Sequence, residues 1–444
     1  MPYLDPAIDM LKIMRFALRF VPMVAMALTL AGCTTVDWSA ERHQALTVAA
    51  APTDRELDVA ALLAAPLTRD DALRIAMVQS PEMRRLWAIH ESELRSAAMG
   101  GRLANPSFSY ERLRSAEGLD IERWVSLGVL DVLTLPQRRR VAAADVEAGR
   151  VRLASDIVDR LTAVRRAWVE AVAAVEKRRY AERVLASAEA SAELAVRMES
   201  AGNFNVLERA RQQSYEADAR SRLIQSRQQE LAARETLLRL LGLNAEQAQR
   251  LTLPARLPAL PAEPMSAPEV SQAINATRLD LRLAGAEWRG AAAAQGLTRV
   301  TSLTDVSLAL REQDTRGFEV EISLPVFDAG DLQRGSASAR VRAAAAQLEQ
   351  TALVASSDLR VGYAAYRSAY DDALHHRDVL VPLRRSISEE TLLRYNGMLI
   401  GVFELLADAR EQVDTVIAAI EANERFWLAE AELQASLLGR PGVQ

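Results

Sequence analysis

Four histidines, His43, His90, His375 and His376, are the residues of this chain best suited to metal binding or acid–base chemistry. His375 and His376 are adjacent in a helix-favouring stretch, where successive side chains point about 100° apart, so the pair does not readily hold one metal ion. Both are interpreted as exposed polar residues of a helix. No serine lies in a nucleophile-elbow context, and no glycine-rich loop that would hold a phosphate occurs. The sequence therefore predicts no enzyme, no metal and no cofactor.

The only cysteine, Cys33, indicates lipid chemistry instead. A basic segment, the short apolar run 21–30 and a few small residues precede it, which is the pattern of a secretory signal and is too short for a spanning helix. Leu30-Ala31-Gly32-Cys33 resembles a bacterial lipobox, so residues 1–32 are expected to be removed and Cys33 to carry lipid, including palmitate. The alternative is an ordinary signal peptide. Thr34 stands where an aspartate would resemble an inner-membrane retention signal, which favours the outer membrane.

The composition excludes some classes of protein. The formal net charge of −5 argues against nucleic acid as a partner, because such proteins carry a basic surface. Half of the residues are apolar but only 5% are aromatic, and alanine is abundant. This composition suits long, closely packed helices.

Two stretches of the sequence are similar and lie roughly two hundred residues apart. This spacing is far longer than the period of about 20–50 residues in solenoid repeats. The segment from Leu67 to Arg84 is echoed by the segment from Met265 to Arg282, and each copy is followed by a long helical stretch broken by a glycine, Gly202 or Gly397. We infer a duplicated half-molecule. The expected organisation is a signal peptide at 1–32, a lipidated tail at 33–66, a first repeat at 67–253, a proline-rich linker at 254–268, a second repeat at 269–439 and a C-terminal tail at 440–444.

Each repeat is expected to contain a helix, two strands, a very long helix and a returning helix. In the first repeat these elements are expected from Thr68 to about Gly100, at Leu103–Leu113, at Trp124–Leu133, at about 138–200 and at Val206–Leu241 with Gly242 as its cap. In the second repeat the first helix is expected to end near Gly296, and the two strands are expected at Val300–Leu310 and Phe318–Phe327. The long helix is expected at about 334–394, and the returning helix is expected to end near Leu438. Before them, 34–66 is expected to be an extended tail with a short helix near Arg55–Leu63. The long helix of the first repeat carries a seam of coiled-coil type, formed by Ile157, Leu161, Val164, Trp168, Val172 and Val175.

The last two strands alternate apolar and polar residues. Phe318, Val320 and Ile322 alternate with Glu319 and Glu321, and the third strand follows the same rule. One apolar and one polar face over about ten residues is typical of a transmembrane β-strand. The alternative is the edge of a soluble sandwich. Four strands are too few to close a barrel around a channel, so membrane strands would have to be pooled from several chains, and three chains would give twelve.

Taken together, these residues resemble the TolC-like outer-membrane efflux proteins, especially their lipidated branch. The resemblance covers Leu67 to Gly439 and depends on the order of several short motifs. They are Leu67-Thr68 with Ala72-Leu73 and Ser80-Pro81-Glu82, Asn105-Pro106, Leu324-Pro325-Val326-Phe327-Asp328, Arg394-Tyr395 with Gly397, and Glu404-Leu405-Leu406. The chain departs from the usual pattern at Pro136-Gln137, where a glycine–lysine pair is more common.

The resemblance implies a mainly helical α+β fold in which long antiparallel coiled-coil helices form a periplasmic α-barrel. Four strands per chain would contribute to a trimeric twelve-stranded β-barrel in the outer membrane. The implied partners are two further copies of the chain, a periplasmic membrane-fusion adaptor, an inner-membrane pump, most simply of the resistance-nodulation-division type, and outer-membrane lipid. No cofactor is implied.

The resemblance also assigns candidate site residues. The adaptor-docking tips would be Gly202, Asn203, Phe204 and Asn205 in the first repeat and Gly397, Met398, Leu399, Ile400 and Gly401 in the second. Exposed apolar residues there would form a docking patch, although the same residues could instead staple the helices of each hairpin.

Two acids after the second tip, Glu404 and Asp408, match the tunnel gate, where a trimer would place three-fold rings of carboxylates. The alternative is a solvated acidic patch paired with Arg410 or Arg394. Arg138, Arg139 and Arg140 are expected where the barrel meets the periplasm, in contact with headgroups or simply solvated.

The predicted function is that of an outer-membrane channel of a tripartite efflux system, which exports small toxic compounds such as drugs or metal ions. Two alternatives remain open. One is the outer-membrane duct of a type I protein secretion system, and the other is a structural lipoprotein that spans the periplasm.

Overall fold

The computed structural model describes residues 37–52, 57–115, 118–268, 270, 278–303, 305–312, 316–323, 326–327 and 329–439. The chain divides into two compact units. One comprises Met1–Glu41, Glu91–Arg150 and Ala284–Leu348, and the other Arg42–His90, Val151–Leu283 and Glu349–Gln444, so each unit draws on both sequence repeats. The expected signal segment, Cys33 and the expected tail 440–444 lie outside the described residues.

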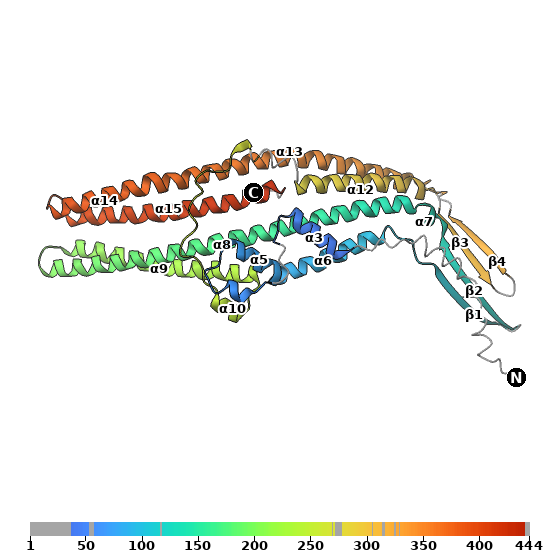
Figure 1. Ribbon diagram of the computed structural model, residues 1–444, viewed down its shortest axis with the longest axis horizontal. Coiled ribbons are helices and arrows are strands. Elements are labelled where there is room, and N and C mark those ends of the chain that lie inside the picture. The colour runs from blue at the N-terminus through green and yellow to red at the C-terminus, as the bar shows by residue number, and fades with distance from the viewer. Residues whose placement is uncertain are drawn as a thin grey trace, which may run out of the picture. The chain divides into compact units, whose positions relative to one another are not determined.

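The fold is mainly helical with one small antiparallel sheet (Figure 1). Before the first strand come α3 (Trp38–Val48), α4 (Val59–Leu62), α5 (Arg69–Gln79) and α6 (Pro81–Met99). The first repeat continues with β1 (Ser107–Ser115), β2 (Gly118–Gly128), α7 (Val129–Leu133), α8 (Leu135–Ser200), α9 (Val206–Leu241) and α10 (Ala245–Arg250). The second contains α12 (Leu279–Thr301), β3 (Asp305–Glu312), β4 (Arg316–Ser323), α13 (Asp331–His375), the π-helix η1 (His376–Leu380), α14 (Val381–Asn396) and α15 (Val402–Leu437).

Helix α8 is 66 residues long and buries the predicted seam. All six seam residues are buried, and the Trp168 indole Nε1–H donates a hydrogen bond of 2.9 Å to the Leu67 carbonyl. Helix α9 begins and ends where the sequence indicates, because Asn205 caps its first turn and Gly242 ends it in the left-handed conformation. The coiled-coil prediction for the first repeat is therefore confirmed.

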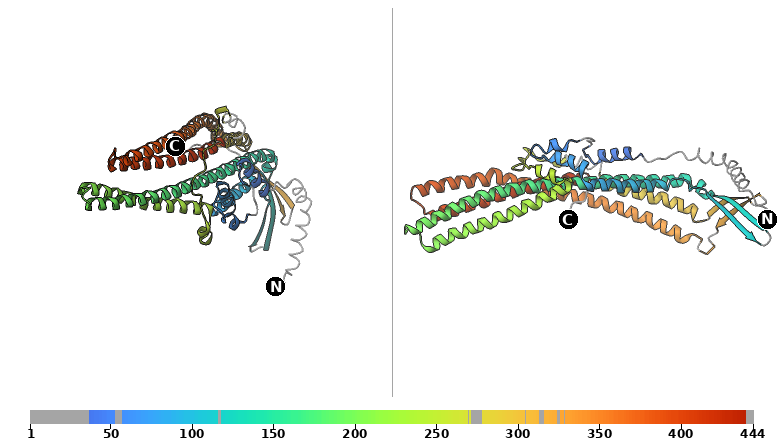
Figure 2. Two further views of the ribbon diagram at one scale, coloured as in Figure 1. Left: turned by 60° about the vertical axis from the view of Figure 1, so that its left-hand side comes forward. Right: turned by 90° about the horizontal axis from the view of Figure 1, so that it is seen from below.

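The second repeat has the same plan with one interruption. Helices α14 and α15 lie side by side (Figures 1 and 2). The helix predicted from 334 to 394 is interrupted by η1, which precedes Pro382. Pro382 has no N–H and its ring clashes with the carbonyl four residues earlier, at Asp378, so the backbone widens there into a π turn.

The helix predicted from Thr68 to about Gly100 in the first repeat is in fact two helices, α5 and α6. The break is at Ser80, whose extended backbone separates α5 from α6. Pro81 accounts for it, because proline disfavours the helical conformation of the residue before it. The Thr68 cap is confirmed, with its side chain accepting from the Asp71 N–H.

The predicted strand bounds need correction. The second strand is Gly118–Gly128, because the apolar run Val129–Leu133 forms helix α7 instead, held by a 2.7 Å hydrogen bond from the Thr134 hydroxyl to the Leu130 carbonyl. In the second repeat α12 continues to Thr301, so β3 begins at Asp305, and β4 ends at Ser323. The first strand, predicted at Leu103–Leu113, is Ser107–Ser115. Apolar residues alone therefore placed the strand ends wrongly by several residues.

The expected extended tail also contains a helix, α3. Its Glu41 carboxylate accepts two hydrogen bonds from the Arg150 guanidinium, at 2.5 and 2.8 Å, and its Ala45 and Leu46 are buried. These tertiary contacts, not a local period, stabilise the helix.

The sheet has the strand order β1-β2-β3-β4, with every neighbouring pair antiparallel. Strands β1 and β4 are therefore its two edges. Among the described residues each edge strand pairs on one side only.

Candidate functional site

The first hairpin end is a tightly hydrogen-bonded turn. Gly202 is left-handed, with φ of +79°, and the N–H groups of Asn203 and Phe204 both donate to the Met198 carbonyl. Asn205 and Glu208 form a capping box at 2.7 and 2.9 Å, so α9 begins in a fixed direction. These bonds make the turn rigid.

The second hairpin end places its strain on a different residue from the one expected. Gly397 has an ordinary φ of −77°, whereas Met398 is left-handed at +58°. A left-handed conformation costs a residue with a side chain about 1–2 kcal/mol. Met398 is 94% exposed and Leu399 is 77% exposed, so the strained turn projects apolar side chains into solvent. Gly401 precedes α15 as its cap residue.

Phe204 is buried, contrary to the expectation that it is exposed. Its ring stacks on Phe403 at a centroid distance of 5.2 Å and an interplanar angle of 24°. Phe403 belongs to α15, so this contact joins the two hairpin ends within one compact unit. Phe204 therefore staples the hairpins, while the exposed apolar residues are Met398 and Leu399.

The two candidate gate acids differ in their surroundings. Glu404 is exposed in the first turn of α15. The Asp408 side chain is only 9% exposed and lies 3.8 Å from the Arg384 guanidinium of α14. Its Oδ2 is buried and accepts no hydrogen bond from the residues that the structure describes.

The alternative that these acids pair with Arg410 or Arg394 is wrong. Arg394 pairs with Glu390, and Arg410 lies 4.3 Å over the ring of Tyr215 and donates to the buried Gln212. Arg384 is the cation next to Asp408, and it also pairs with Glu411. Arg384 lies on the neighbouring helix α14, so residue spacing along α15 does not predict its contact with Asp408.

Ion pairs connect α15 to the first repeat along its length. They join Arg222 to Asp414 at 3.3 Å, Lys177 to Glu424 at 2.6 Å, Arg166 to Glu432 at 2.6 Å and Arg69 to Glu430 at 3.1 Å. Burial raises the pKa of the Glu430 carboxyl, and the nearby Arg69 opposes that rise.

Away from the β1–β2 and β3–β4 turns, the sheet gathers apolar side chains on one face. One row across all four strands joins Phe108, Val125, Leu310 and Phe318, and the next joins Leu127, Leu308 and Val320. On the other face Arg311 lies 3.4 Å from Glu319, and the Ser307 hydroxyl donates to Glu321. The alternation predicted for β3 and β4 is confirmed, except that Val300 lies in α12.

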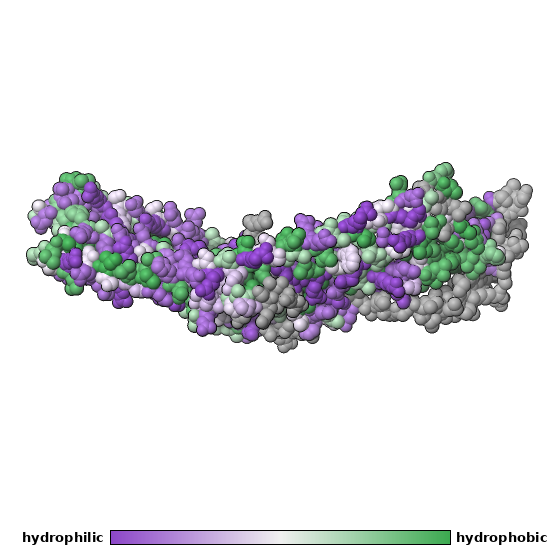
Figure 3. All heavy atoms as spheres, turned by 90° about the horizontal axis from the view of Figure 1, so that it is seen from above, coloured by the Kyte–Doolittle hydropathy of each residue, from purple (hydrophilic) through white to green (hydrophobic). Residues whose placement is uncertain are grey.

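Exposed apolar residues continue from the strands into the segments beside them. Leu133 is 70% exposed, Val326 73%, Phe327 102% and Leu332 78%. Figure 3 shows apolar surface gathered near the strands of the unit that contains the sheet.

Three arginines follow Leu133 in the sequence. Arg138 pairs with Asp131 and donates to the Gly100 carbonyl, while Arg139 and Arg140 are exposed.

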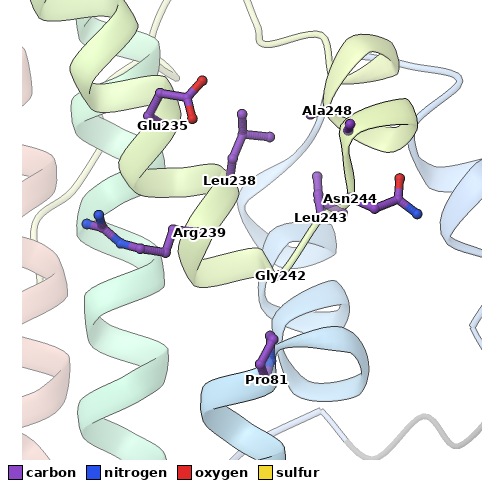
Figure 4. A pocket seen from close by; sticks show the side chains of 9 residues that line it. Pro81, Glu235, Leu238, Arg239, Gly242, Leu243, Asn244 and Ala248 are labelled. Carbon is purple, nitrogen blue, oxygen red and sulfur yellow. The ribbon is translucent and has the colours of Figure 1, made fainter.

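A shallow pocket of about 560 Å³ lies where α9 ends (Figure 4). Its lining includes Pro81, Leu238, Gly242 and Asn244. Gly242 has φ of +73°, and a Cβ there would lie 2.6 Å from Pro81 Cδ and 2.9 Å from the Gln79 carbonyl oxygen. The pocket contains a close backbone approach, which only glycine permits.

Apart from the adjacent pair His375 and His376, the histidines lie on different helices, His43 on α3 and His90 on α6. His90 is buried with Nε2 2.7 Å from Asp156, His375 is exposed, and His376 is half-buried with Nε2 3.7 Å from Asp372. Among the residues described, no cluster of three or more His, Cys, Asp or Glu side chains is arranged to hold a metal ion. No helix of the described ranges is long and apolar enough to cross a membrane.

No protein-family model and no curated protein matches the sequence. Solved structures do. The chain is similar to the outer membrane protein VceC of Vibrio cholerae, with 15% identity, a TM-score of 0.70 and coverage of 84% of this chain and 96% of that one. It is also similar to the Campylobacter jejuni CmeC outer membrane channel, with 12% identity, a TM-score of 0.70 and coverage of 88% and 93%. The open state of the Neisseria gonorrhoeae MtrE outer membrane channel matches with 18% identity, a TM-score of 0.66 and coverage of 85% and 90%.

The protein has the TolC-like fold. The resemblance seen in the sequence is thereby confirmed for the fold across nearly all of the chain. In this chain the second hairpin end exposes a strained apolar turn, and the sheet exposes rows of apolar side chains. Sequence reasoning found both places, but it missed the strain at Met398 and the Arg410–Tyr215 contact, which no local pattern marks.

Proposed function

We propose that the protein is the outer-membrane channel of a tripartite efflux system, which exports small toxic compounds such as drugs or metal ions from the periplasm to the exterior. It would work as a lipid-anchored homotrimer with a periplasmic adaptor and an inner-membrane pump, most simply of the resistance-nodulation-division type. The observation that carries the proposal is a four-stranded sheet with two open edges and an exposed apolar face. The likeness to three outer-membrane proteins, two of them named as channels, supports it.

The open edges require partner strands in a membrane. In lipid each unpaired backbone N–H or carbonyl costs several kcal/mol, so β1 and β4 need to pair. Pairing β1 of one protomer with β4 of the next gives twelve strands from three chains. That number permits a closed barrel with a water-filled interior.

The apolar face needs a lipid environment. Phe318 is 75% exposed, Ile322 55% and Phe108 55%, whereas a soluble protein hides rows of this kind. A structural lipoprotein without a membrane barrel has no use for such a face. The opposite face, with its Arg311–Glu319 pair, would line the channel.

We expect a covalent trimer from cysteines placed on the two edge strands. Ser109→Cys on β1 and Glu321→Cys on β4, both on the polar face, should be joined by a short bifunctional cross-linker between protomers, because the two edges meet only in an assembly. Denaturing electrophoresis should show dimer and trimer bands after membrane extraction.

The matched control places both cysteines inside the sheet. Ser126→Cys on β2 and Ser307→Cys on β3 lie on adjacent strands of one chain, so cross-linking should leave a monomer band. A stable monomer for the edge pair in bilayers would contradict the shared barrel.

The second hairpin end is the proposed adaptor contact. Replacing Met398 by glycine removes both the 94% exposed side chain and the left-handed strain. We expect protomer stability to rise by about 1 kcal/mol while binding of the adaptor's periplasmic hairpin falls roughly tenfold. Thermal melting and surface plasmon resonance measure the two effects.

The control for this experiment is Leu231→Ser. Leu231 on α9 is 59% exposed but lies outside the turn, so its loss should leave adaptor binding unchanged. Equal affinities for the wild type and Met398→Gly would remove this turn from the docking surface.

A further inference from the structure

One face of β1 changes in chemical character along its length. Residues two apart on a strand share a face, so Phe108, Tyr110, Arg112 and Arg114 form one line of side chains that ends near the β1–β2 turn. Phe108 is 55% exposed, Tyr110 is 46% exposed and both arginines are exposed. The line runs from apolar through amphipathic to cationic.

The two arginines lie opposite apolar residues. Arg112 faces Ile121 and Arg114 faces Leu119 in the register. Neither forms an ion pair with any residue that the structure describes. The other arginines of the sheet differ, because Arg123 lies opposite Glu312 and Arg311 pairs with Glu319.

The acids of β1 and of the part of β2 that pairs with it near the turn are on the opposite face. Glu111 lies opposite Glu122, and Asp120 lies opposite Leu113. Because side chains alternate along a strand, these residues are on the face that Arg112 and Arg114 do not share. Like charges placed directly opposite each other repel, which is tolerable for side chains that face water. Between the turn and Arg112, strands β1 and β2 thus carry their acids on one face and these two arginines on the other.

We propose that Arg112 and Arg114 bind the phosphate groups of lipid headgroups in the leaflet that the β1–β2 turn reaches. This inference rests on the proposed function, in which the apolar face of the sheet meets lipid. Guanidinium groups bind phosphate through paired, charge-assisted hydrogen bonds. Tyrosines such as Tyr110 occupy the boundary between hydrocarbon and headgroups.

The spacing along the strand fits the layers of a bilayer. A strand rises about 3.3 Å per residue, so Arg112 lies roughly 7 Å beyond Tyr110 and roughly 13 Å beyond Phe108. The headgroup layer on each side of the hydrocarbon core is about 5–7 Å thick. With Tyr110 at the boundary and the strand tilted by about 45°, Arg112 lies about 5 Å and Arg114 about 9 Å beyond it along the bilayer normal, so Arg112 falls among the headgroups and Arg114 at their outer edge.

The test measures lipid retention by the full-length trimer. Wild type and the double variant Arg112→Gln/Arg114→Gln are reconstituted in nanodiscs that contain a bis-phosphorylated glucosamine lipid or its dephosphorylated form, and bound lipid is counted by native mass spectrometry after release. Each basic residue near an anionic surface contributes about fivefold in affinity. We expect the double variant to retain the phosphorylated lipid at least tenfold less well and the dephosphorylated lipid equally well.

The matched control is Arg311→Gln, which removes a guanidinium from the opposite face of the same sheet. It should retain the phosphorylated lipid as the wild type does. Competition with inorganic phosphate separates a headgroup site from a free-anion site, and displacement at millimolar phosphate would overturn the lipid assignment. Equal retention by all three proteins would also overturn the inference. A wild type that forms no trimer in the nanodisc would instead contradict the proposed function.

Discussion

We expect Gly242→Val to abolish folding of the protomer, or to lower its thermal stability more than any other single substitution considered for this chain. Gly242 ends α9 in the left-handed conformation, and a Cβ there would lie 2.6 Å from Pro81 Cδ and 2.9 Å from Ser80 Cα. The left-handed strain contributes about 1–2 kcal/mol, and forcing atoms into a packed site adds about 1–3 kcal/mol. The expected loss is therefore roughly 2–5 kcal/mol.

Gly202→Ala is the control that separates strain from crowding. Gly202 has nearly the same φ, +79°, but no atom lies within 4 Å of the position that a Cβ would take there. This variant should lose only the strain, about 1–2 kcal/mol. Melting curves followed by helical circular dichroism compare the two proteins. A Gly242→Val protein that melts together with Gly202→Ala would show that the α9 end relaxes away from Pro81.

The same contact shows why part of the fold is readable from sequence and part is not. Helix α9 was predicted at its observed bounds, because its Asn205 cap and Gly242 end are local signals that the backbone obeys. The partner of Gly242 is the turn at Ser80–Pro81, over a hundred residues earlier in the chain. No period within α5 and α6 marks that approach, although Pro81 itself indicates a break.

Errors elsewhere have the same origin. The run Val129–Leu133 is apolar enough for a strand, but Asp131 pairs with Arg138, and the segment coils into α7. Helix α3 is stabilised by the distant Arg150, so its own residues show no sustained period. Tertiary contacts override local preference at these places.

For the candidate site, position was predictable and environment was not. Gly202 and Gly397 located both hairpin ends, although only Gly202 takes the left-handed conformation and Met398 takes it at the second end. The burial of Phe204 depends on Phe403, and that of Asp408 depends on Arg384, which lies on a neighbouring helix. Such pairings follow from how the hairpins pack and not from spacing along either helix.

The environment of Asp408 leads to the second large effect. The Asp408 side chain is 9% exposed and lies 3.8 Å from Arg384, so it holds α15 against α14 close to the second hairpin end. Truncating one partner of a buried charged contact costs about 3–5 kcal/mol, because the other charge is left buried and less well paired. Arg384 keeps Glu411 in this case, which places the expected local cost at the low end of that range.

We therefore expect Asp408→Ala to loosen the second hairpin end and to open the proposed gate. Single-channel conductance in planar bilayers should increase severalfold, and the preference for cations should fall because a ring of carboxylates is lost. Glu404→Ala is the matched control, since Glu404 is one helical turn away but exposed. It should lower cation preference slightly without raising conductance, so the double variant should match Asp408→Ala in conductance and have a slightly lower cation preference. The sheet is untouched in all three proteins, so the trimer should survive extraction equally well. Unchanged conductance and selectivity in the double variant would mean that neither acid narrows the channel, and the constriction would then have to lie at the rigid Asn203–Asn205 turn of the first hairpin.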